Sequence, residues 1–198
     1  MSALDYAESI AFLSWLFADT QGAVELRAIR SEGGAVSVFT RDPETVVTFC
    51  RRHGGPGRGK GPKGGVYLGA ATRTAGIAKG DREHCLELPA LWSDIDCVAR
   101  SIDQDEAISA LLSLPHPPSC IVDSGRGLHP WWKLKEPLDL SDPKGDEAVI
   151  AVLRQLAGVC GGDLKVCDIA RVMRLPGTLN TKGAEPVLCR VIYGGPGK

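Results

Sequence analysis

Two aspartates separated by one residue follow an apolar run near the middle of the chain. Residues 91–96 read Leu-Trp-Ser-Asp-Ile-Asp, and a strand there would point Asp94 and Asp96 to the same face. Two carboxylates on one face suit a pair of divalent cations about 3.5–4 Å apart. Mg²⁺ and Mn²⁺ both prefer such oxygen ligands. The motif indicates a metal site, and a solvated strand face is the alternative interpretation.

A glycine-containing turn that ends in a histidine is the second chemical feature. Residues 124–129 read Ser-Gly-Arg-Gly-Leu-His, followed by Pro-Trp-Trp. The two glycines allow the backbone to approach a phosphate closely, and Arg126 adds positive charge. His129 stands where the next strand would begin and could donate a hydrogen bond to a phosphate oxygen. A plain hairpin whose histidine packs against the neighbouring tryptophans fits the pattern equally well.

A third cluster combines carboxylates with cationic side chains near the C-terminal end. It contains Asp163, Asp168, Arg171, Arg174 and Lys182. If Asp168 caps a helical turn, the two arginines share one face at i, i+3 spacing. Arginine forks suit the oxygens of a triphosphate. Taken alone, the cluster also fits a surface turn with solvated charges.

The glycine-rich and basic stretch 54–65 approaches the pattern of a phosphate-binding P-loop. Gly54, Gly59 and Lys60 match, but Gly61 replaces the Ser or Thr that would bind magnesium. Proline then follows where a helix should begin. The stretch is therefore interpreted as a basic flap that touches nucleic-acid backbone, or as a plain disordered loop.

Composition limits the class of protein. The chain has 198 residues, 43% of them hydrophobic, with a formal net charge of −1, so any nucleic-acid contact must rest on local basic patches. Its seven cysteines are odd in number and never form a CxxC pair, which disfavours a disulfide framework or a zinc knuckle. We expect no signal peptide before residues 10–17, and that apolar run is too short to span a membrane. We expect a cytoplasmic protein without a membrane partner.

Periodicity and turn signals predict an α+β fold. The sequence predicts helices over 4–18, 42–53, 104–114 and 144–159, and strands over 23–30, 35–40, 66–70, 91–96, 120–123, 128–134 and 187–193. Hairpins among these strands favour α+β over a doubly wound sheet. The length suggests a single domain covering 1–198. The glycine-rich end, 194–198, looks like a linker, so we expect the domain to be the N-terminal part of a longer protein.

Taken in order, these features resemble the archaeo-eukaryotic primase superfamily, and within it the primase-polymerases of plasmids and phages. That family has a DxD motif, a small-residue turn ending in histidine, and a hydrophobic-Asp motif. Residues 170–182, Ala-Arg-Val-Met-Arg-Leu-Pro-Gly-Thr-Leu-Asn-Thr-Lys, resemble its R-x-x-R-x-P-G-T-x-N-x-K tail. The resemblance covers roughly residues 66–193. It implies a catalytic core with an α/β lobe packed on an RNA-recognition-motif-like lobe.

The resemblance also implies an activity and a set of site residues. It implies a DNA primase or DNA-directed polymerase that makes or extends primers on single-stranded DNA from NTPs or dNTPs, with a helicase as a possible partner. Asp94, Asp96 and Asp163 would hold two Mg²⁺ or Mn²⁺ ions, with Asp168 as the alternative third carboxylate; motif spacing favours Asp163. His129 and Arg174 would contact the phosphates of the incoming nucleotide, and Ser124, Arg126, Lys182 and Arg73 are further phosphate contacts.

Two other functions fit parts of the pattern. A nucleotide-sugar glycosyltransferase also uses a DxD motif and a cation, but that class does not explain the turn before His129 or the arginine-rich tail. A non-catalytic module that binds replication origins would have no need to hold three acids together against their mutual repulsion. The sequence leaves open whether ribonucleotides or deoxynucleotides are used, and whether chains are started or only extended.

Overall fold

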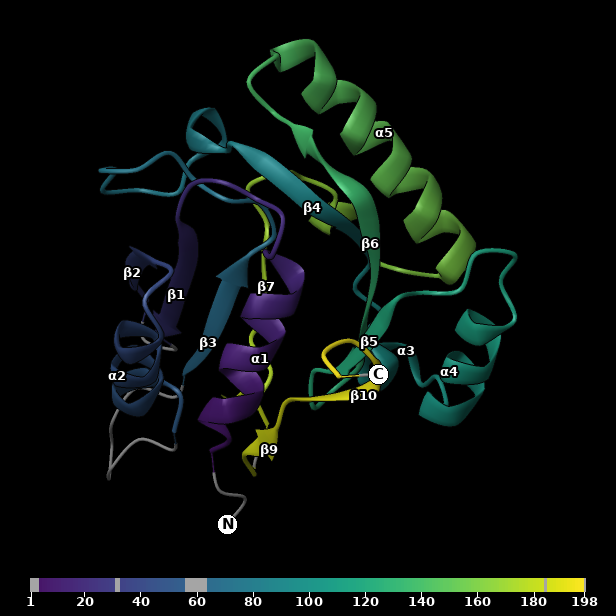
Figure 1. Ribbon diagram of the computed structural model, residues 1–198. Coiled ribbons are helices and arrows are strands. Elements are labelled where there is room, and N and C mark those ends of the chain that lie inside the picture. The colour runs from purple at the N-terminus through teal and green to yellow at the C-terminus, as the bar shows by residue number, and fades with distance from the viewer. Residues whose placement is uncertain (1–3, 31–32, 56–63, 184, 198) are drawn as a thin grey trace.

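The chain folds into two antiparallel four-stranded sheets with helices packed on them (Figure 1). The computed structural model describes residues 4–30, 33–55, 64–183 and 185–197. The helices are α1 Tyr6–Leu16, α2 Pro43–His53, α3 Cys97–Arg100, α4 Gln104–Leu112 and α5 Pro143–Cys160, with short 3₁₀ turns η1 Arg82–His84 and η2 Leu164–Val166. The strands are β1 Val24–Arg30, β2 Ala35–Thr40, β3 Gly64–Gly69, β4 Glu87–Trp92, β5 Cys120–Asp123, β6 Leu128–Asp139, β7 Val172–Arg174, β8 Leu179–Asn180, β9 Val187–Leu188 and β10 Arg190–Gly194. The predicted α+β class is confirmed.

The first sheet has the strand order β2-β1-β3-β7. Strands β1 and β2 pair antiparallel as the predicted hairpin of residues 23–30 and 35–40, with Val24 opposite Thr40. Helix α2 follows at once, because the side chain of Asp42 accepts hydrogen bonds from the first free amides and Pro43 occupies the first helical position. Most of the predicted basic flap lies at residues 56–63, outside the described residues, while Gly64 and Gly65 already belong to β3.

The second sheet has the order β10-β5-β6-β4, and α5 runs along it in Figure 1. The β5–β6 hairpin turns at residues 124–127, as predicted. Strand β4 ends at Trp92, earlier than the predicted strand 91–96. Beyond Trp92 the chain keeps a hydrogen bond from Ser93 N to Pro130 O and an isolated bridge between Ile95 and Leu128. Asp96 then caps α3, accepting a hydrogen bond from Ala99 N at 2.9 Å.

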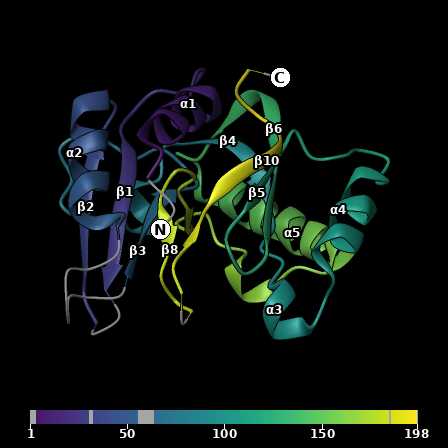
Figure 2. The same ribbon diagram turned by 90° about the horizontal axis from the view of Figure 1, so that it is seen from below.

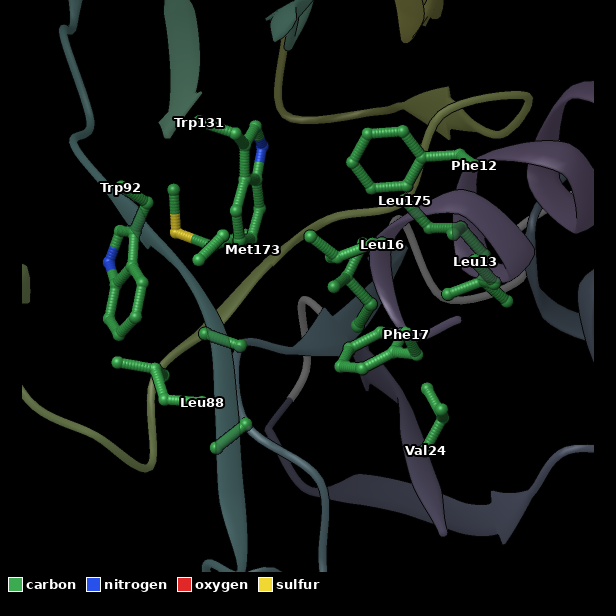
Figure 3. Packing of buried hydrophobic residues seen from close by; sticks show 14 of the residues in the cluster. Phe12, Leu13, Leu16, Phe17, Val24, Leu88, Trp92, Trp131, Met173 and Leu175 are labelled. Carbon is green, nitrogen blue, oxygen red and sulfur yellow. The ribbon is translucent and has the colours of Figure 1, made fainter. Parts of the chain in front are cut away.

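One buried cluster joins the two sheets through α1. Phe12 of α1 packs edge-on against Trp131 of β6, with ring centroids 6.0 Å apart, and Phe17, directly after this helix, lies beside Val24 of β1 (Figure 3). Met173 of β7 lies beside Trp131 and Trp92 in the same view. Seen from below, α2 and the first sheet stand on one side and α4 on the other (Figure 2). Because the buried cluster is continuous across both sheets, it fixes the position of the first sheet relative to the second.

The segment that follows Asp168 differs from its predicted conformation. Val172–Arg174 forms strand β7, paired with β3 so that Arg174 faces Tyr67, and is not a helical turn. The segment Val172–Arg174 pairs with the free edge of β3 and buries Met173 and Arg174. This pairing outweighs the tendency of Asp168 to begin a helical turn. Arg171 and Arg174 consequently do not share a helix face.

The described helices include none that combines the length and apolar character needed to cross a membrane.

Candidate functional site

Asp94 and His129 form the centre of the candidate site. His129 Nε2 lies 3.5 Å from Asp94 Oδ1, with His129 buried and Asp94 about one third exposed. Asp94 and His129 lie close together because their chain segments are hydrogen-bonded to each other. Ile95 forms a β-bridge with Leu128, and the amide of Ser93 donates to Pro130 O. Burial would raise the pKa of Asp94, but the hydrogen bond with His129 and nearby positive charges outweigh it and hold the pKa below its ordinary value.

The turn before His129 is pressed against the backbone of the DxD segment. A Cβ on Gly127 would overlap the carbonyl oxygen of Ile95 and lie 3.0 Å from Cys97 N. Gly125 adopts a φ of 83°, in the left-handed region. Both glycines of the turn are therefore needed for its shape, and Gly127 sets how closely the turn approaches Asp94 and Asp96.

We expect Gly127→Ala to lower both stability and any activity of the site. The added methyl group must push the turn away from Ile95, at a cost of about 1–3 kcal/mol in the free energy of unfolding. Urea denaturation measures this loss. Gly158→Ala in α5 is the matched control, because a Cβ there meets nothing within 4 Å and alanine is the better helix former. Equal stability of the two variants would contradict the close approach.

Asp96 and Asp163 lie near Asp94, but their side chains accept hydrogen bonds from local backbone amides. Asp163 N donates to Asp94 O at 2.8 Å, so this backbone bond holds the two residues side by side. The side chain of Asp163 accepts from Lys165 N at 2.9 Å, as Asp96 does from Ala99 N. Within the described parts of the chain, the second carboxylate oxygens of Asp96 and Asp163 accept no hydrogen bond.

The carboxylate oxygens of Asp94, Asp96 and Asp163 are of the type that divalent cations prefer. Their ligand atoms do not lie close enough together in this structure to form a ready-made site. Among the described residues, only Asp81, Glu83 and His84 bring three potential ligand atoms within 4.8 Å of one another. Asp94 is held ionised by its lowered pKa, and Asp96 and Asp163 each keep an uncommitted oxygen. Rotation of the latter two side chains would release one capping bond each, at about 1 kcal/mol per cap.

A basic cavity of about 280 Å³ opens beside Arg174 and Lys182. Arg174 is almost fully buried, stacks on Tyr67 at 4.5 Å from the ring centroid, and leaves Nη1 without a hydrogen-bond partner among the described residues. Gly65 makes room for this guanidinium, since a Cβ there would overlap Nη1. Burial raises the pKa of Tyr67 while Arg174 opposes the rise. Sequence reasoning identified Arg174 and Lys182 but missed Tyr67 and Gly65, whose pairing depends on the β3–β7 register.

Ser124, Arg126 and Lys182 were all predicted to contact phosphate, but their surroundings in the structure differ. The hydroxyl of Ser124 is buried and donates to Gly127 O at 3.0 Å, while its carbonyl accepts from Asn180 Nδ2 at 2.7 Å. Ser124 therefore supports the turn. Arg126 is half-buried, and Lys182 is exposed at the cavity. Asn180 was also missed, because its contact spans two distant segments.

Arg73 lies inside the protein, away from any surface that a nucleotide could reach. It is fully buried, pairs with buried Glu25 at 3.1 Å and donates to Ala71 O at 2.7 Å. This position does not support the predicted phosphate contact. A longer hydrogen bond of 3.4 Å to Ala170 O links Arg73 to the segment before β7.

Asp168 and Arg171 form an ion pair of their own. Arg171 Nε lies 3.2 Å from Asp168 Oδ2, and the same guanidinium donates to Lys165 O at 2.6 Å. Arg171 and Lys182 nevertheless lie near enough to help lower the pKa of Asp94. Two cationic side chains from a distant segment of the sequence therefore act on Asp94.

Comparison with known proteins gives matches in structure alone. No protein-family model matches the chain, and no curated protein matches its sequence. The AEP domain of the cyanophage S-2L primase-polymerase (PrimPol) superposes with a TM-score of 0.70 at 18% identity, covering 100% of this chain and 94% of that one.

Two structures of a primase also match. Primase RepB′ gives a TM-score of 0.63 at 13% identity, covering 94% of this chain and 56% of that chain. The catalytic domain of primase RepB′ in complex with initiator DNA gives 0.62 at 15% identity, covering 94% and 85%. The chain therefore has the fold of archaeo-eukaryotic primase catalytic domains, the superfamily that its three motifs resemble.

Proposed function

We propose that this chain is a template-dependent nucleotidyltransferase that makes or extends primers on single-stranded DNA. The observation that carries the proposal is the Asp94–His129 pair, at 3.5 Å, within electrostatic reach of Lys182, which lines the same basic cavity as Arg174. An acidic centre beside a cationic cavity suits a nucleoside triphosphate with its cations. The primase fold supports this assignment over a glycosyltransferase.

Asp94, Asp96 and Asp163 would hold two divalent cations. When bound, such ions activate the attacking hydroxyl and neutralise charge on the phosphates of the substrate and the leaving pyrophosphate. The ionised state of Asp94 and the uncommitted oxygens of the other two aspartates support this role. Asp163 is preferred as the third ligand because its amide bonds to Asp94 O, whereas Asp168 is committed to Arg171.

The remaining side chains of the site would bind and orient the triphosphate. His129, whose Nε2 lies 3.5 Å from Asp94 Oδ1, would exchange this contact for a hydrogen bond to a phosphate oxygen of the bound nucleotide. Arg174 is held by Tyr67 and has a free donor, Nη1, so a phosphate oxygen would satisfy a buried group that is otherwise unpaired. Lys182 adds charge at the mouth of the cavity. Arg126 is a further contact.

Template-directed incorporation tests the proposal. The purified chain is incubated with Mg²⁺ or Mn²⁺, each nucleotide in turn, and homopolymer DNA templates with and without a primer. We expect only the complementary nucleotide to be incorporated. Product on unprimed templates would add initiation to the activity, and product on primed templates alone would limit it to extension.

The other functions predict different outcomes in the same preparation. A glycosyltransferase would hydrolyse or transfer a nucleotide sugar and make no polymer. A non-catalytic module would bind DNA or nucleotide without turnover. Either result, with circular dichroism showing an intact fold, would contradict the proposed activity.

A further inference from the structure

One buried side chain joins the two halves of the candidate site. Asn180 of β8 is 4% exposed, and its Nδ2 group donates to Ser124 O at 2.7 Å. Its Oδ1 atom accepts a hydrogen bond from Lys182 N at 3.1 Å. Ser124 begins the turn that leads to His129, while Lys182 lines the basic cavity together with Arg174. A single carboxamide therefore connects this turn to the segment that carries the cationic side chains.

The turn itself is held between two other segments. On one side Gly127 meets the backbone of Ile95, where a Cβ would overlap the carbonyl oxygen. On the other side a Cβ on Gly125 would lie 3.2 Å from the Cβ atom of Asn180. The first contact joins the turn to the segment of Asp94, and the second joins it to β8. The position of the turn thus determines how the carboxylates lie relative to the basic cavity.

The carboxamide of Asn180 matches both of its partners. It supplies a donor to the Ser124 carbonyl and an acceptor to the Lys182 amide, which no hydrocarbon side chain can do. Cys189 Sγ also lies 3.4 Å from Ser124 O, but a thiol is a weak donor. Without Asn180 the turn would lose the short hydrogen bond that links it to β8.

The arginine of the cavity is held by other contacts. Arg174 stacks on Tyr67, and its strand β7 pairs with β3. Neither contact involves Asn180 or the turn, so removal of the amide should shift His129 while Arg174 stays in place. A shift of about 1 Å between groups that act on one substrate can slow a reaction by about 10²-fold.

We infer that Asn180 is a positioning residue, which holds His129 at the distance from Arg174 and Lys182 that lets all three bind one triphosphate. The inference rests on the proposed function and deepens it by adding a residue that acts through others. The two hydrogen bonds of the Asn180 side chain go to protein backbone. Its effect on the reaction is therefore transmitted by the turn and by the segment of Lys182.

Transfer kinetics and nucleotide affinity of Asn180→Ala test the inference. We expect the single-turnover rate at saturating nucleotide to fall by about 10²-fold. The affinity for a fluorescent dNTP analogue should change by no more than about threefold, because Arg174 keeps its position. In a His129→Ala background the same substitution should cost little further rate, because most of its effect passes through His129. Equal losses in the two backgrounds would contradict this route.

Thr178→Val is the matched control for Asn180→Ala. The Thr178 hydroxyl is buried and donates to Leu175 O at 2.7 Å, so this variant also loses a buried hydrogen bond, but one within its own segment. We expect both variants to lower the melting temperature by a few degrees, and only Asn180→Ala to slow transfer. Equal transfer rates in the two variants would make Asn180 a structural residue and overturn the inference.

Asn180→Asp serves as a second variant if Asn180→Ala does not fold. It keeps the size of the side chain and the acceptor for Lys182 N, but an ionised carboxylate cannot donate to Ser124 O. We expect transfer by Asn180→Asp to be as slow as by Asn180→Ala. The wild-type rate in Asn180→Asp would overturn the inference.

Nuclear magnetic resonance of the histidine side chains separates this inference from the proposed function. The chain has four histidines, so comparison with His129→Ala assigns the imidazole signals of His129. A non-hydrolysable dNTP with Mg²⁺ should shift these signals in the wild type and much less in Asn180→Ala. Equal shifts in the two proteins would overturn the role of Asn180. A shift in the wild type that is lost in Asn180→Ala, without polymer synthesis by either, would count against the proposed function and not against the inference.

Discussion

Asp94→Asn should abolish nucleotidyl transfer, reducing the rate by roughly 10³-fold or more. The substitution keeps the shape of the side chain and the contact with His129, but it removes the negative charge at the centre of the site. Without this charge the bound cation would stabilise the transition state by several kcal/mol less. Each 1.36 kcal/mol of that loss slows the reaction tenfold. Primer extension under single-turnover conditions measures the loss directly.

Asp81→Asn is the matched control for this variant. Asp81 is an exposed carboxylate, and together with Glu83 and His84 it forms the group of potential ligand atoms found among the described residues. We expect full activity from Asp81→Asn. The reverse result, with Asp81→Asn inactive and Asp94→Asn active, would move the metal site to η1.

Arg73→Met should destabilise the fold by about 3–5 kcal/mol, because it leaves the buried Glu25 without its buried partner. Arg27 Nη2 at 2.6 Å and Ser37 Oγ at 3.0 Å still contact Glu25 Oε1, but Oε2 loses the neighbour that lies 3.1 Å away. The free energy of unfolding in urea gives the magnitude. Nucleotide affinity of the protein that remains folded should change little.

The double variant Arg73→Met/Glu25→Leu separates pairing from simple loss of contacts. Removing both charges avoids an isolated buried ion, so the double variant should recover part of the stability lost in Arg73→Met. If Arg73 instead contacted a nucleotide, Arg73→Met would weaken nucleotide binding and leave stability almost unchanged. That pattern would restore the role predicted from the sequence.

Local signals were sufficient to predict most elements of the fold. Asp42 with Pro43 predicted the start of α2, and the glycine turn predicted the β5–β6 hairpin, because in both cases the residues that determine the structure are neighbours in the chain. The strand at β4 was displaced because Asp96 caps a short helix, which an alternating pattern does not reveal. The segment after Asp168 became a strand because β3 offered it an edge.

The site was predictable in its residues and less so in their contacts. Spacing identified Asp94 and His129, and the structure brings them to 3.5 Å. Arg73 was assigned to phosphate from charge and position alone, and its burial against Glu25 depends on tertiary structure. Tyr67 carried no signal in the sequence, because its importance arises only when β7 places Arg174 over its ring.

Locating the cations and the triphosphate together tests the central claim most directly. Crystals grown with Mn²⁺ and a non-hydrolysable nucleoside triphosphate would show manganese by its anomalous scattering. Our account predicts manganese bound by Asp94, Asp96 and Asp163, with the phosphates against His129 and Arg174. Manganese only at Asp81, Glu83 and His84, or a triphosphate bound away from Arg174, would contradict it.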